Sequence, residues 1–253
     1  MIKTLFNKSN FIAISVSAVL CGILISCIHL IYFGEATFEA AFLCARDGTI
    51  DLGDGQFHVD LFICFLNCVT TLPFIIRLFS DDFDIYKAYL FVRHKGKNKW
   101  FLYKLFQCYF YCLYSAALYN GVIMLVTKLF GYQAENNITV AGYYLFAVWA
   151  SFIILAFAAM LGNIMTLFFK PVLVNTVVML LTGMSLGVTI IMTRREHIQF
   201  NLLSNFFISW HIMMSRYEDM YSLPTFAYYL IIILIMLFAV IAGKKAFNKA
   251  DLL

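Results

Sequence analysis

Long apolar segments constrain the fold of this chain more than any other feature. A bilayer core of roughly 30 Å requires about 20 mostly apolar residues in one helix. The chain is 63% hydrophobic and 13% charged, whereas a water-soluble domain carries about 25% charge. We therefore expect an all-α integral membrane protein, with one domain over residues 1–253 and six transmembrane helices. The expected spans are Phe11–Phe33, Val59–Phe79, Leu105–Phe130, Tyr143–Phe169, Val172–Met192 and Phe226–Ala242.

The distribution of lysine and arginine predicts the orientation. If both termini are cytoplasmic, thirteen basic residues lie inside and five lie outside. Cytoplasmic loops carry an excess of these residues, so we expect both ends of the chain in the cytoplasm. Residues 1–10 should lie at the inner interface. Residues 194–225 are too apolar for a free loop and too polar to span, which predicts short interfacial or re-entrant helices on the outer side.

One loop, residues 81–104, differs from the rest of the chain. It holds six of the eighteen lysine and arginine residues. The acidic residues at its start suit a helix N-terminus, and Ile85, Tyr89 and Val92 recur at helical spacing on one apolar stripe. A helix with an apolar stripe and a basic end can lie on anionic lipid or insert into a groove on a soluble partner.

Motifs for catalysis and nucleotide binding are missing from the sequence. No G-x-x-x-x-G-K-[ST], H-E-x-x-H or G-x-S-x-G pattern occurs, and the five histidines are scattered. The expected spans also lack the buried carboxylates of proton-coupled transporters. We therefore expect a non-catalytic membrane subunit with no metal or cofactor of its own and no nucleic-acid partner. A transporter of this kind would need an external source of energy.

Polar and small residues inside the expected spans leave alternatives open. The polar side chains either form interhelical hydrogen bonds or contact a transported molecule. Gly183 and Gly187 form a small-xxx-small pattern that suits helix packing within the chain as well as dimerisation. Small residues in the fourth span predict close helix approach. The polar residues are Asn67, Thr70, Thr71, Gln107, Asn120, Asn163, Asn175 and Thr182.

Two further patterns occur, one after the expected helix of the loop and one after the sixth expected span. The loop continues after its helix with Arg93, Gly96, Lys97, Trp100 and Lys104, and the chain ends with Phe247, Lys249, Asp251, Leu252 and Leu253. Together with the six-span length and the apolar outer segment, these patterns resemble the permease subunits of ABC-2 type transporters, the type V exporter architecture. In that family a cytoplasmic helix that ends in an arginine joins the second and third spans.

The resemblance implies an assembly. Two permease subunits, identical or homologous, would pair, and two separate ATPase subunits that bind ATP and Mg would dock beneath them. Spans two and five would face the translocation pathway, so its candidate residues are Asn67, Thr70, Thr71, Asn175 and Thr182. The loop Ile85–Lys97 would be the coupling helix. The candidate ATPase-coupling residues are Ile85, Tyr89, Val92, Arg93, Gly96, Lys97, Trp100 and Lys104.

The resemblance further implies export of an amphipathic substrate, such as a peptide, an antimicrobial or a lipid-like molecule, across a bacterial plasma membrane. The main alternative is a membrane-embedded sensor or adaptor whose basic loop binds anionic lipid or a cytoplasmic partner. A small-molecule capture subunit would fit the six spans, but it would not explain the amphipathic loop.

The orientation can be tested with reporter fusions. We expect a reporter fused at Asn98 to be cytoplasmic and one fused at Asp51 to be external, because the basic residues concentrate on the side of Asn98. The opposite result would overturn both the orientation and the coupling role of the loop.

Overall fold

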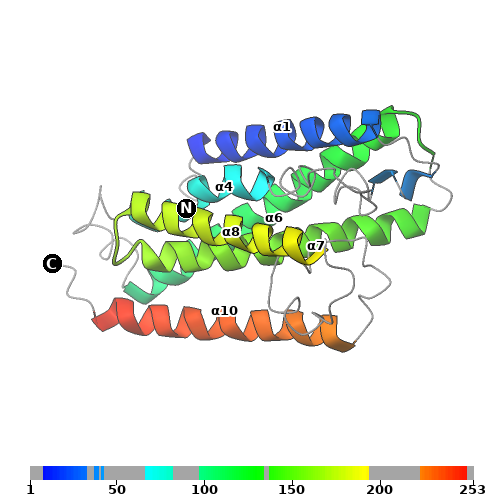
Figure 1. Ribbon diagram of the computed structural model, residues 1–253. Coiled ribbons are helices and arrows are strands. Elements are labelled where there is room, and N and C mark those ends of the chain that lie inside the picture. Colours follow the sequence, from blue (N-terminus) through cyan, green and yellow to red (C-terminus); the bar gives the residue numbers. More distant parts are fainter. Residues whose placement is uncertain are drawn as a thin grey trace.

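The described part of the protein is an all-helical bundle. The computed structural model describes residues 8–32, 37–39, 41–42, 66–81, 97–133, 137–193 and 223–249, and these residues contain no strand. The main helices lie side by side (Figure 1). The prediction of an all-α fold is confirmed for this part of the chain. The helices are α1 (Lys8–Tyr32), α4 (Leu66–Ile76), α6 (Lys97–Leu129), α7 (Asn137–Met165), α8 (Pro171–Thr193) and α10 (Leu223–Lys249).

The outer faces of the bundle are compatible with a membrane. Large apolar side chains point outward, such as Leu129, Val172 and Phe238, whose exposed fractions are 77%, 70% and 73%. An apolar surface of this extent is typical of contact with lipid or a partner. Three of the described helices are long and apolar enough to cross a membrane, over Lys8–Ile28, Asn98–Leu129 and Val140–Met165.

The helix bounds differ from the expected spans by up to eight residues, and the differences at α6 and α4 concern the loop. α6 begins at Lys97 instead of Leu105, so the basic residues before the expected span already belong to the helix. α4 contains Pro73 and ends at Ile76, three residues before the expected end of the second span. A turn at Arg77 follows α4, and residues 78–81 are helical again. The N-terminal part of the second expected span, residues 59–65, lies outside the described residues.

Local sequence explains where α6 ends and where α8 begins. Gly131 has a φ of 92°, a conformation that glycine adopts readily at the end of a helix. Its N–H donates to the Lys128 carbonyl at 3.1 Å. Pro171 is the first residue of α8, where a missing N–H is tolerated. Residues 166–170 connect α7 to α8 directly, so the two helices form a tight hairpin.

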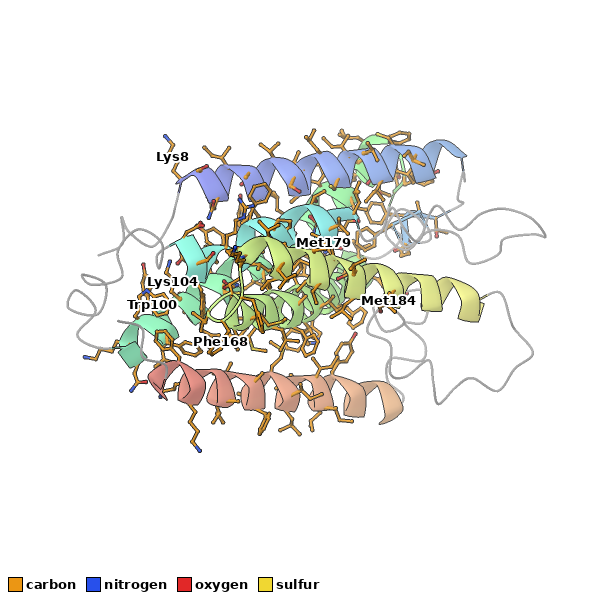
Figure 2. All side chains as sticks on the ribbon, turned by 60° about the vertical axis from the view of Figure 1, so that its left-hand side comes forward. Lys8, Trp100, Lys104, Phe168, Met179 and Met184 are labelled. Carbon is orange, nitrogen blue, oxygen red and sulfur yellow. The ribbon has the colours of Figure 1, made fainter. Side chains whose placement is uncertain are left out.

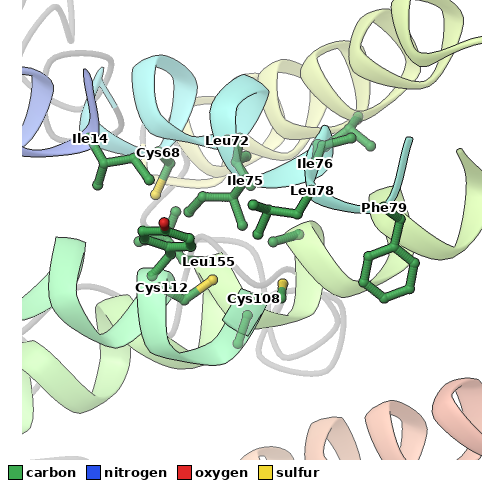
Figure 3. Packing of buried hydrophobic residues seen from close by; sticks show 14 of the residues in the cluster. Ile14, Cys68, Leu72, Ile75, Ile76, Leu78, Phe79, Cys108, Cys112 and Leu155 are labelled. Carbon is green, nitrogen blue, oxygen red and sulfur yellow. The ribbon is translucent and has the colours of Figure 1, made fainter. Parts of the chain in front are cut away.

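α6 is the central helix and packs most extensively against α1 and α7. The main core cluster joins α4, α6 and α7, and Figure 3 shows Leu72 and Ile75 of α4 near Cys108 and Cys112 of α6. Several small residues of α7 are buried within the bundle, and Ala156 and Ala159 belong to this cluster. Those that are fully buried or nearly so include Ala147, Ala150, Ala156, Ala159 and Gly162.

The expected interhelical hydrogen bonds are present at two asparagines. Asn120 of α6 donates through Nδ2 to Ser151 Oγ of α7 at 3.2 Å. Asn163 of α7 donates to the Ile75 carbonyl of α4 at 2.8 Å. Both amides are buried. The bundle therefore contains polar contacts inside and apolar side chains outside, an arrangement suited to an apolar solvent.

Gly183 of α8 makes no close helix contact in the described part of the protein. Gly183 is exposed, and a Cβ at this position would meet no heavy atom within 4 Å among the described residues. The surroundings of Gly187 lie outside the description. Pairing of α8 with a second copy of the chain stays a prediction.

Gly162 permits the close contact between α7 and α4. A Cβ at this position would lie 2.7 Å from Ile76 Cγ1, so Gly162→Ala should push the two helices apart. We expect the free energy of unfolding to fall by about 1–3 kcal/mol, measured by denaturant titration in mixed micelles. Gly183→Ala is the matched control and should leave stability unchanged or raise it by up to about 1 kcal/mol. Equal losses in both variants would contradict this role of Gly162.

Candidate functional site at the loop root

The structure describes both flanks of the basic loop. Residues 82–96 lie outside the described residues, and with them the predicted coupling residues Ile85, Tyr89, Val92, Arg93 and Gly96. The chain is described up to Asp81 and again from Lys97.

We define the loop root as the described residues that hold these two flanks. It consists of Phe79 before the loop, Trp100 and Phe101 after it, Phe247 near the end of α10, and Asn163 of α7.

Four aromatic rings form the centre of the loop root. Trp100 stacks on Phe247, with ring centroids 5.3 Å apart, and contacts Phe79 edge to face at 5.5 Å. Phe101 contacts Phe79 at 5.7 Å and Phe247 at 5.9 Å. These separations favour aromatic pairs. The two flanks of the loop and the end of α10 thus share one buried cluster.

Trp100 and Lys104 occupy supporting positions and not an exposed docking face. Their exposed fractions are 0% and 6%. The coupling role of both residues was an implication of the family resemblance, which places an aromatic residue and then a lysine at the start of the third span. In the structure both lie within α6, one and two turns after its first residue, and they face the interior.

Asn163 holds the loop root from the side of α7. Its Nδ2 donates to the carbonyls of Ile75 and Ala159, both at 2.8 Å. Its Oδ1 accepts a hydrogen bond from the Phe79 N–H at 3.2 Å. The sequence identified Asn163 only as one of several polar residues within the spans. The only sign of its role was an amide in an apolar segment.

Basic residues gather at the end of the bundle that carries the loop root. Figure 2 shows Lys8, Trp100 and Lys104 toward this end and Met184 toward the other. Lys170, Lys244 and Lys245 lie at helix ends on the same side, because α7 and α10 both finish there. Within the part of the chain that the structure describes, Lys128 is the basic residue near the opposite end.

The structure describes all five predicted pathway residues, and Thr70 is the one that lies at the groove between α1 and α4. This groove has a volume of about 1140 Å³, and Thr70 accepts a hydrogen bond of 2.6 Å from Ser17. Thr71 and Thr182 donate to carbonyls of their own helices, Asn67 and Val178 respectively. The other residues that line the groove are mainly apolar, with Lys8 and Ser9 at its end.

The two predicted pathway asparagines differ from Asn120 and Asn163. Asn67 Oδ1 and Asn175 Oδ1 are buried atoms without a hydrogen-bond partner in the described part of the protein. An unsatisfied buried oxygen is unfavourable by about 1–3 kcal/mol. These two oxygens therefore remain available to a donor outside the described residues.

The cysteines do not assemble a metal site among the described residues. No group of three or more His, Cys, Asp or Glu side chains is placed to hold a metal ion there. Cys68, Cys108 and Cys112 are buried in the main core cluster, where they pack as small apolar side chains.

Comparisons with known proteins give no match. No protein-family model, no curated protein and no solved structure is similar to this chain at a significant level.

The stack of Trp100 on Phe247 can be tested by a double-mutant cycle. We expect Phe247→Ala to lower the free energy of unfolding by about 3–5 kcal/mol, as for other buried aromatic residues. The coupling energy between Trp100→Ala and Phe247→Ala should be about 0.5–1.5 kcal/mol. Phe238→Ala on the same helix is the control, because its ring is 73% exposed. Additive effects of the two substitutions would contradict the stack.

Proposed function

We propose that this protein is the transmembrane permease subunit of an ATP-driven exporter. In this proposal the chain has six spans with both termini in the cytoplasm of a bacterial cell. It pairs with a second permease subunit and takes energy from two ATPase subunits, which carry ATP and Mg. The proposal rests on the sequence resemblance and on one structural observation, the loop root.

The loop root supports coupling because it joins the loop to three helices. A partner that displaces residues 82–96 would move Phe79 and Trp100, which flank the loop and contact each other. Close packing transmits such displacements, since buried side chains have few voids to move into. Through Phe247 the displacement would also reach α10.

Two observations support contact with an amphipathic substrate. The groove between α1 and α4 is apolar along most of its length and carries the Ser17–Thr70 hydroxyl pair. The amide oxygens of Asn67 and Asn175 have no partner in the described part. In this proposal Thr70, Asn67 and Asn175 contribute polar contacts along the pathway, and peptides or antimicrobials are the leading substrates.

A sensor or adaptor is the second candidate. The basic residues at the loop-root end of the bundle favour it, because juxtamembrane lysines and arginines attract anionic lipid. This candidate needs no ATPase, and the following experiment separates the two.

The proposal predicts that the protein co-purifies with an ATPase through the loop. We expect Tyr89→Asp and Val92→Asp to abolish the association, because each places a charge on the apolar stripe of the expected helix. Leu90→Asp is the control, since at about 100° per residue position 90 faces away from that stripe. The measurement is the amount of ATPase recovered with the tagged protein. If both stripe variants retain the ATPase at the wild-type level, the assignment of Ile85–Lys97 as the coupling helix is wrong. If the wild type recovers no ATPase, the sensor becomes the leading candidate.

A further inference from the structure

The backbone hydrogen-bond ladder is interrupted just before the loop, after the end of α4. In an uninterrupted helix the Phe79 N–H would donate to the Ile75 carbonyl. Here the Asn163 side chain stands between them. Its Nδ2 donates to the Ile75 carbonyl at 2.8 Å, and its Oδ1 accepts from the Phe79 N–H at 3.2 Å. One side-chain amide from α7 thus replaces one backbone hydrogen bond after α4.

The surroundings of Asn163 favour this insertion. The side chain is 1% exposed, and its neighbour Gly162 allows α4 to approach so closely that a Cβ would overlap Ile76. The turn at Arg77 lies between the two backbone groups that the amide joins. Side-chain insertion into the ladder is a known cause of helix kinks.

We propose that Asn163 is a positioning residue that latches the last turn before the loop. In the latched arrangement, residues 78–81 are held by α7 through the amide. In the released arrangement, the Phe79 N–H returns to the Ile75 carbonyl and the segment straightens. The amide thereby sets the direction in which the chain enters residues 82–96.

Both arrangements satisfy the backbone. Ile75 and Phe79 have a partner whether the amide is inserted or withdrawn, which matters because unpaired backbone groups are unfavourable in an apolar environment. On release, Asn163 Nδ2 keeps its bond to the Ala159 carbonyl and lies 3.6 Å from Cys108 Sγ. Only Oδ1 loses its partner. Release therefore leaves one buried oxygen without a partner, so the latched arrangement is the more stable of the two.

The role of the latch in coupling rests on the proposed function, whereas its structural part does not. Asn163→Leu removes the donor and the acceptor at similar size. In the full-length protein in lipid nanodiscs, we expect amide hydrogen exchange over residues 77–81 to accelerate by about tenfold or more, because this segment is then held only by local backbone hydrogen bonds, which open more readily than a segment also bound to α7. Asn120→Leu is the matched control. It removes another buried interhelical amide, and it should leave exchange over residues 77–81 unchanged.

Unchanged exchange in Asn163→Leu, or equal acceleration in Asn120→Leu, would overturn the latch. If Asn163→Leu does not accumulate in the membrane, Asn163→Ser is measured in its place and should accelerate exchange in the same segment. This arm is independent of any ATPase, so failure of the proposed function leaves its outcome interpretable.

The second arm measures coupling in the complex with the ATPase. We expect Asn163→Leu to retain the ATPase at the wild-type level and to lose at least about half of the substrate stimulation of ATP hydrolysis. Asn163→Gln, which keeps both hydrogen-bonding groups, should recover part of it. Asn120→Leu should keep the wild-type response. Full stimulation in Asn163→Leu would overturn the role of the latch in coupling.

Discussion

The arrangement of the bundle at the loop depends on the contact of α7 with the end of α4. A break in a helix exposes a carbonyl and an N–H, and in an apolar environment neither finds water. Asn163 supplies both missing partners, and Gly162 brings its backbone close enough to do so. Without this pair of residues, the turn at Arg77 would leave two buried backbone groups unsatisfied.

The aromatic cluster extends this contact across the bundle. Phe79, whose N–H binds Asn163, also places its ring against Trp100 and Phe101. Phe247 closes the cluster from α10. Two sequence patterns that lie far apart in the chain, one after the loop and one near the C-terminal end, therefore meet in a single buried site. Their joint presence in the sequence has a physical reason, because the rings of Trp100 and Phe247 stack on each other.

The sequence predicted the helices well and the site poorly. Long apolar segments identify α1, α6 and α7 because length and composition suffice for this inference. The start of α6 was placed too late, since its lysines are typical of a loop until Lys104 and Trp100 are seen to be buried. Trp100 is buried in part by Phe247 of α10. A local sequence pattern cannot show such a contact between distant helices. Likewise, a sequence shows that Asn67 and Asn163 are amides in apolar spans, but not which one finds a partner.

The latch and the groove are linked because both are built on α4. Thr70 lines the groove against α1, while Ile75 of the same helix receives the Asn163 amide. These two residues are less than two turns apart, with Pro73 between them. If release of the latch also shifts the end of α4, the wall of the groove moves together with the start of the loop. The groove and the start of the loop lie at different depths of the bundle, and α4 alone would connect them. A more extended network of contacts is not required.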